Sequence, residues 1–133
     1  MSKRSRRIVV DGVPYQWSVL HHHHSDRRTS SEEVLSFCGP AQPRRIVFTA
    51  VAEPPRIVSD GVWFAHHIAT SPGAPLVNLN EPGVVAQLIR MAQSCSTSGR
   101  DVDGWELLTN FTVTDEGRLL PITPPGTVAA RRR

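Results

Sequence analysis

At 133 residues, of which 39% are apolar and 20% charged, the chain has the size and composition of one globular domain. Its two cysteines, Cys38 and Cys95, lie far apart without a CxxC spacing, which argues against a disulfide framework and against a cysteine-rich zinc site. No apolar stretch approaches the ~18 residues of a membrane helix, and the run over residues 8–10 is too short for the apolar core of a signal peptide. The sequence therefore predicts a soluble, cytoplasmic protein.

The positive charge of the chain is concentrated at its two ends. Although the formal net charge is +3, seven of the 15 basic residues lie in residues 1–7 and 131–133, so that residues 8–130, with all 12 acidic residues, carry a net charge of −4. Residues 1–7 and 121–133 are expected to be flexible, on either side of a single domain over residues 8–120. Flexible basic ends can bind nucleic-acid phosphates without sequence preference. The candidates for such contacts are Arg4, Arg6, Arg7, Arg131, Arg132 and Arg133.

The N-terminal part of the domain has the pattern of a β-hairpin. Apolar residues 8–10 precede Asp11-Gly12, and apolar side chains then alternate with polar ones from Val13 to Val19. Asp-Gly supplies the positive φ angles of a tight hairpin turn, and the alternation places one set of side chains on one face. Pro14 lacks a backbone donor, which predicts an edge position or an irregular start for the second strand.

Residues 20–43 are polar apart from Val34, Leu35 and Phe37, and contain four consecutive histidines. A histidine-containing loop is expected here. Within it, the hydroxyl residues 29–31 before two glutamates are typical of a short helical turn, whereas residues 34–37 are equally typical of a short strand.

Residues 45–51 are rich in β-branched side chains and predict a strand bounded by prolines. Residues 56–64 then repeat the pattern of residues 7–15 at six of nine positions, with Asp-Gly again between apolar runs. A second hairpin with the same turn chemistry explains this echo more simply than an internal duplication.

One helix is indicated, over about residues 82–93. Asn80 is a suitable cap, Glu81 complements the positive end of the helix dipole, and proline is tolerated in a first turn. A single apolar stripe follows, formed by Val84, Val85, Leu88, Ile89 and Ala92. The stripe is expected to dock on the sheet.

The C-terminal part of the domain is expected to be β structure. Residues 105–108 and 111–113 have strand composition, and Asp115-Glu116-Gly117 is a third turn signal. Prolines at 121, 124 and 125 oppose regular pairing in the tail. Together these elements predict an α+β domain in which an antiparallel sheet of about four to six strands packs on the helix.

The segment Val10-Asp11-Gly12-Val13 with Tyr15 and Trp17, together with residues 79–89 and Gly104-Trp105, resembles a group of small uncharacterised bacterial proteins. That group shares an N-terminal hairpin and one C-terminal helix that leads to a Gly-Trp pair. The resemblance covers about two-thirds of the chain and implies a fold but no activity, cofactor or catalytic residue. Residues 94–103 form a longer link than is usual in the group.

Among the residues of the sequence, the histidines give the clearest indication of a specific chemistry, which is metal binding. Residues in a strand alternate between faces, so His21 and His23 would share one face, and His66 and His67 could complete a metal site if the fold brought them close. A solvated histidine loop explains the same residues. Cys38 lacks the accompanying signature of a nucleophile, and no phosphate-binding glycine motif occurs.

The sequence contains no credible set of catalytic residues and no cofactor motif, whereas the spacing of its apolar residues is typical of a folded domain. The sequence therefore favours a small non-catalytic interaction or accessory protein that binds another protein. The alternatives are an auxiliary nucleic-acid binder that uses the basic ends, and a metal-binding protein that uses the histidine tract.

Overall fold

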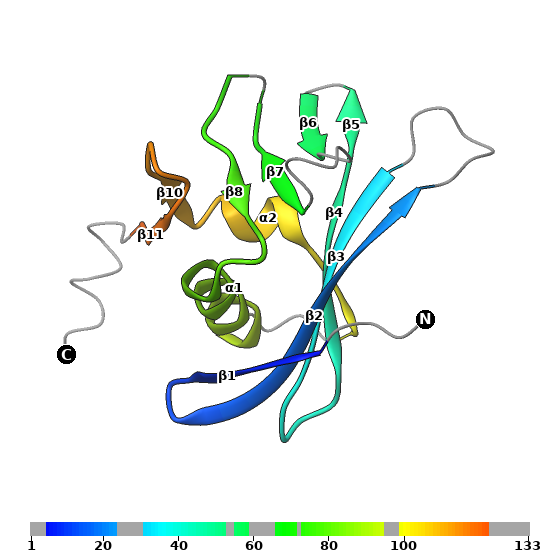
Figure 1. The fold of residues 1–133 in the computed structure, drawn as a ribbon, viewed down its shortest axis with the longest axis vertical. Coiled ribbons are helices and arrows are strands. Elements are labelled where there is room, and N and C mark those ends of the chain that lie inside the picture. Colours follow the sequence, from blue (N-terminus) through cyan, green and yellow to red (C-terminus); the bar gives the residue numbers. More distant parts are fainter. Residues whose placement is uncertain are drawn as a thin grey trace.

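The computed structural model describes residues 5–23, 31–52, 55–58, 66–71, 73–94 and 99–122. It confirms the predicted α+β class, because a five-stranded, mainly antiparallel sheet packs against one main helix (Figure 1). Two smaller sheets complete the described part of the fold. Neither described helix is long and apolar enough to cross a membrane.

The large sheet has the order β1-β2-β3-β4-β9. Its strands are β1 (Arg6–Val10), β2 (Val13–His23), β3 (Ser31–Cys38), β4 (Arg44–Thr49) and β9 (Asp101–Asp103). The second sheet contains β5 (Val51–Ala52), β6 (Pro55–Val58), β7 (His67–Ala69) and β8 (Val77–Asn78). A small sheet joins β10 (Phe111–Val113) to β11 (Leu119–Pro121), and the helices are α1 (Pro82–Ser94) and α2 (Gly104–Leu108). Among the described pairs, only β4 and β9 run parallel.

The first hairpin forms as predicted. Asp11 and Gly12 have φ angles of 51° and 81°, which a two-residue turn requires, and β1 pairs with β2 from Arg6 opposite Trp17 to Val10 opposite Val13. Pro14 lies in β2, an interior strand of the sheet, although the pairing of β2 with β3 begins only at Gln16. The proline is therefore tolerated because its part of β2 has no neighbour on the β3 side.

The structure corrects the loop expected over residues 20–43. Strand β2 continues through the histidines to His23, and β3 extends over Ser31–Cys38, opposite it. The helical turn considered near residues 29–33 is wrong at Ser31 and the residues after it, since these belong to β3. These strands accommodate polar side chains because some of them, such as His21 and Glu33, form hydrogen bonds with each other across the sheet.

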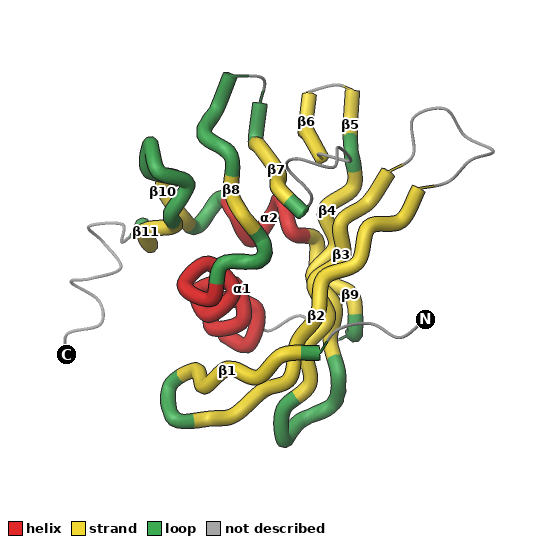
Figure 2. The backbone as a smooth tube through the Cα atoms, viewed as in Figure 1, coloured by secondary structure: helices red, strands yellow, loops and turns green. Residues whose placement is uncertain are grey.

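Helix α1 buries the predicted stripe, and Leu88 and Ile89 are fully buried (Figure 2 shows α1 on one side of the sheet). Each large aliphatic side chain buried in this way contributes roughly 1.5–3 kcal/mol. The helix begins at Pro82, as expected, but the residue directly before it is Glu81, whose carbonyl accepts from Val85 N. Asn80 therefore lies outside the capping position.

The strand predicted over residues 105–108 is wrong, because Gly104–Leu108 form helix α2. The Asp103 side chain accepts from Trp105 N and caps the helix. Residues 111–113 do form a strand, and the turn over residues 115–117 connects it to β11, in which Pro121 pairs with Phe111.

Six aromatic side chains contribute to the core. Tyr15, Trp17, Phe37, Phe48, Trp105 and Phe111 are buried in one core cluster with the α1 stripe. Residues 59–65 lie outside the described residues, and with them most of the segment 56–64 that repeats the pattern of residues 7–15. Residues 123–133, which include the basic C-terminal end, also lie outside the described residues.

Candidate functional site

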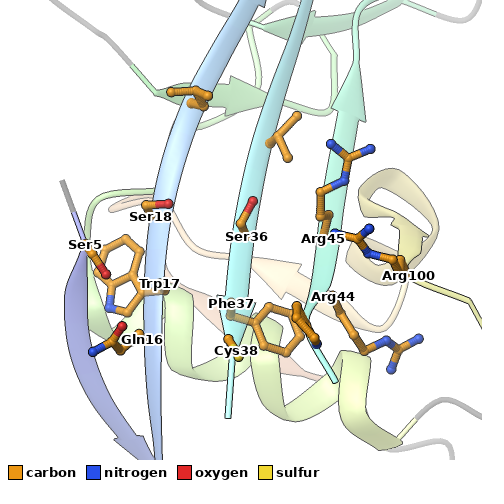
Figure 3. Close-up of a pocket in the computed structure, with 13 residues that line it drawn as sticks. Ser5, Gln16, Trp17, Ser18, Ser36, Phe37, Cys38, Arg44, Arg45 and Arg100 are labelled. Atoms are coloured by element: carbon orange, nitrogen blue, oxygen red, sulfur yellow. The ribbon is translucent and has the colours of Figure 1, made fainter. Parts of the chain in front are cut away.

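A concave region of about 550 Å³ lies on the face of the large sheet opposite α1 (Figure 3). We call it the sheet-face groove. The residues that line it are Ser5, Gln16, Trp17, Ser18, Leu20, Val34, Ser36, Phe37, Cys38, Pro43, Arg44, Arg45 and Arg100. No carboxylate is among these lining residues.

Strand alternation produces the floor of the groove. Leu35 and Phe37 point into the core cluster, so the residues between and around them on β3 point the other way. Ser36 lies opposite Ser18 of β2 and Arg45 of β4, which forms a polar row across three strands. Because serine side chains are short, the part of this row formed by Ser18 and Ser36 is the floor of the groove.

The next row along the same face is apolar. Leu20 lies opposite Val34, and Val34 lies opposite Val47. Val34 is only 3% exposed although it does not belong to the core cluster, whereas Leu20 is 38% exposed. The groove therefore offers an aliphatic contact one strand repeat, about 6–7 Å, from its polar row.

Three arginines line the β4 side of the groove. The Arg45 guanidinium makes two hydrogen bonds to Asp101, from Nε to Oδ1 at 2.9 Å and from Nη2 to Oδ2 at 2.8 Å. The hydrogen bond from Arg45 lowers the pKa of Asp101, and Arg100 contributes further to that lowering by its charge. Arg44 donates to the carbonyl of Ala92 near the end of α1 at 2.9 Å. Arg44 is thus engaged at the end of α1, and Arg45 and Arg100 provide the positive charge beside the groove, partly balanced by Asp101 and Glu32.

A second polar cluster lies on the core side of the sheet. Glu33 of β3 is fully buried, and its Oε2 lies 2.6 Å from Nδ1 of His21, directly opposite on β2. Its Oε1 lies 2.8 Å from Nδ1 of His66, which comes just before β7. An ionised carboxylate can only accept, so both imidazoles donate from Nδ1 when Glu33 is charged. These contacts compensate the burial of the carboxylate.

The structure brings together two of the four predicted metal-site histidines, His21 and His66, through Glu33 rather than directly. His67 belongs to β7 and pairs with Asn78, and the side chain of His23 lies outside the described residues. Within the described ranges, no group of three or more His, Cys, Asp or Glu side chains is arranged to hold a metal ion.

The expected flexible N-terminus is corrected at two of its arginines. Arg6 and Arg7 are part of β1, and the Arg6 guanidinium lies 4.6 Å from the centre of the Trp17 ring. The other predicted phosphate contacts, Arg4 and Arg131, Arg132 and Arg133, lie outside the described residues.

The sequence did not single out Glu33, Ser18, Ser36 or Arg100. The alternation Glu33, Leu35, Phe37 was the available signal for Glu33, since it places the carboxylate on the same face as two core residues. Arg100 had no such signal, because it approaches the groove through the pairing of β9 with β4.

Comparison of the chain with family models, curated proteins and solved structures found no match. The resemblance to small bacterial proteins stays a prediction.

Proposed function

We propose that the protein is a non-catalytic interaction domain that binds an extended acidic segment of another protein in the sheet-face groove. The observation that carries this proposal is the combination of an arginine-lined side with a low serine floor on the sheet face opposite α1. Guanidinium groups bind carboxylates with good geometry, and hydroxyl groups donate to or accept from a peptide backbone. We also propose a cytoplasmic location, on the basis of the scarce, widely spaced cysteines.

The two rows of the floor suggest the order of residues in the bound segment. The polar row contains Ser36 and Arg45, and the aliphatic row contains Leu20 and Val34. Side chains two positions apart in an extended peptide are also about 6–7 Å apart and point the same way. An acidic residue followed or preceded at the second position by an aliphatic residue therefore fits both rows.

The groove is less suited to a nucleic acid. Binding of single strands uses exposed aromatic rings on which bases stack. Trp17 and Phe37, the two aromatic residues of the groove, are 3% and 2% exposed and belong to the core cluster. An arginine-lined surface that lacks an exposed ring favours a carboxylate-bearing peptide over a base.

A random extended-peptide library displayed on phage and selected on the full chain tests the proposal. The expected consensus contains Asp or Glu with an aliphatic residue two positions away. Synthetic peptides of that consensus should bind at least about tenfold more weakly to Arg100→Glu, a loss of ~1.4 kcal/mol. Arg118→Glu is the matched control, because it makes the same change in net charge at an exposed arginine that lines a different cavity.

Cys38 supplies an independent readout, since it is exposed and lines the groove. In a Cys95→Ser background, a bound consensus peptide should slow alkylation of Cys38. A library without acidic enrichment, equal losses in both arginine variants, or unprotected Cys38 would each contradict groove binding. Binding of single-stranded RNA or duplex DNA that depends on Arg100, without peptide binding, would replace the proposal with the nucleic-acid alternative.

A further inference from the structure

A second cavity, of about 590 Å³, lies at the β1 edge of the sheet and is lined by Arg6, Trp17, Ser18, Val19, His66 and Asn80. We call it the edge pocket. It forms because β1 pairs with β2 only as far as Arg6 opposite Trp17, whereas β2 continues to His23. Beyond that point His66 and Asn80, from distant parts of the sequence, lie beside β2. The volume is in the range of small-molecule sites, roughly 300–1,000 Å³.

The backbone and the side chain of His66 are both held in place in the pocket wall. Its φ angle is +64°, a left-handed conformation that is uncommon for residues other than glycine. Its backbone carbonyl accepts from Leu79 N at 2.9 Å, and its Nδ1 lies 2.8 Å from the fully buried Glu33. Strained backbone at a residue that is fixed on several sides is a feature of functional sites.

The contact with Glu33 also determines what His66 can offer. When Nδ1 donates to the carboxylate, Nε2 on the opposite side of the ring remains for a ligand, as an acceptor in the neutral ring and as a donor in the protonated ring. Both Glu33 oxygens are engaged, one by His66 and one by His21, so the carboxylate has a fixed orientation. Glu33 is therefore a positioning residue for His66 and does not itself line the pocket.

The rest of the wall contributes donors and one cation. The Arg6 guanidinium lies over the Trp17 ring and donates to the Asn80 carbonyl over a long 3.4 Å contact. Trp17 Nε1 is buried, and no acceptor for it occurs in the described part of the chain. An unsatisfied buried donor carries a free-energy cost. A ligand oxygen that reached this ring edge would remove that cost.

We propose that the edge pocket binds a small organic molecule through an oxyanion, either a carboxylate or a phosphate. Arg6 supplies the opposing charge and Trp17 Nε1 a further donor, whereas His66 Nε2 accepts from a hydroxyl of the organic body in the neutral ring and donates to the oxyanion in the protonated ring. The pocket is far larger than an inorganic ion needs, and Val19 and the Trp17 ring provide an apolar wall for an organic body. The edge pocket shares Trp17 and Ser18 with the sheet-face groove, but its cation is Arg6, and the proposal does not rest on peptide binding in the groove.

The test uses matched probes with the full chain labelled with ¹⁵N. Sodium benzoate and phenyl phosphate carry an oxyanion on an aromatic ring, benzamide is the neutral analogue of benzoate, and inorganic phosphate has no organic body. The expected result is that benzoate or phenyl phosphate shifts the Trp17 indole and His66 ring resonances in a saturable way, whereas benzamide and inorganic phosphate do not. Which of the two probes binds identifies the oxyanion.

Variants separate this site from nonspecific binding. Arg6→Gln should weaken binding of the effective probe at least tenfold, whereas Arg7→Gln, the same change at the neighbouring strand position, should leave it unaltered. Glu33→Gln leaves one acceptor oxygen for two imidazoles, so it should weaken binding and change the Nδ1 hydrogen-bond signature of His66. If that variant does not fold, His66→Asn replaces it, because asparagine tolerates positive φ.

Three results would overturn the proposal. They are no saturable shift with either oxyanion probe, equal binding of benzamide and benzoate, or equal losses in the Arg6 and Arg7 variants. Because none of these results depends on Arg100 or on peptides, failure here is distinguishable from failure of groove binding.

Discussion

Replacing Gly104 with alanine should destabilise the fold through a single steric contact. A Cβ atom at this position would lie 2.4 to 2.6 Å from three atoms of the Phe48 ring. Carbon atoms pack at about 3.5–4.0 Å, so the ring must move by roughly 1 Å. Phe48 is fully buried and meets the Trp105 ring edge-on at a centroid distance of 5.2 Å, which leaves it little freedom to move.

The size of the effect follows from two opposing contributions. Overpacking costs about 1–3 kcal/mol, and loss of glycine freedom in the unfolded chain returns about 0.4–1 kcal/mol. We expect Gly104→Ala to lower the free energy of unfolding by about 1–2 kcal/mol, which corresponds to a fall in Tm of roughly 4–10 °C for a domain of this size. Urea unfolding followed by tryptophan fluorescence measures the loss, with an unchanged m-value as evidence that two-state unfolding is retained.

Gly83 is the matched control. It lies in the first turn of α1, and a Cβ atom there would meet nothing within 4 Å. Gly83→Ala should therefore stabilise the protein by up to about 1 kcal/mol. If Gly104→Ala lost less than about 0.5 kcal/mol, or if the two variants changed stability in the same direction, the proposed contact with Phe48 would be refuted.

Leu88→Ala should lower the free energy of unfolding by roughly 2–5 kcal/mol in urea titration, because it leaves a cavity in the fully buried α1 stripe; a loss below about 0.5 kcal/mol would show that the stripe is not packed. Gly117→Ala should cost more than ~1 kcal/mol by the same measurement, since φ is +81° and the new Cβ would lie 2.1 Å from the Leu76 carbonyl oxygen; an unchanged stability would contradict that turn geometry. Asp101→Asn should cost at most about 1 kcal/mol at pH 7, because its exposed pair with Arg45 is screened by solvent. Since the folded-state pKa of Asp101 is lowered, this contribution is present above an unfolded carboxyl value of about 4 and is lost as the pH falls through the folded value; an equal cost at pH 7 and pH 2 would refute the assignment.

The elements predicted correctly are those in which local chemistry and the apolar period agree. Asp11-Gly12 predicts the first turn, and the spacing of Val84, Leu88 and Ile89 predicts which face of the helix is buried. Both signals depend only on neighbours in the sequence. Helix α2 was not predicted because its five residues are too few to display a helical period, and its start depends on a hydrogen bond that the Asp103 side chain accepts from Trp105 N.

The candidate sites depend on partners that are distant in the sequence. The sequence pattern does not reveal the role of Glu33, because its two imidazole partners, His21 and His66, come from a neighbouring strand and from a segment 33 residues later. The sheet-face groove similarly combines β2, β3 and β4 with Arg100. Strand pairing creates these neighbourhoods, and strand order cannot be read from the polarity of one segment.

The parallel pairing of β4 with β9 has a consequence for the order of assembly. Strands β1 to β4 are consecutive and each pairs with the next, whereas β9 joins β4 only after the chain has passed through the second sheet and α1. Contacts between distant residues close slowly because the intervening chain must be ordered first. During synthesis the serine floor of the groove can therefore form before Arg100 reaches its side. A chain truncated before Arg100 would present the floor without this arginine, so the complete groove requires the chain as far as β9.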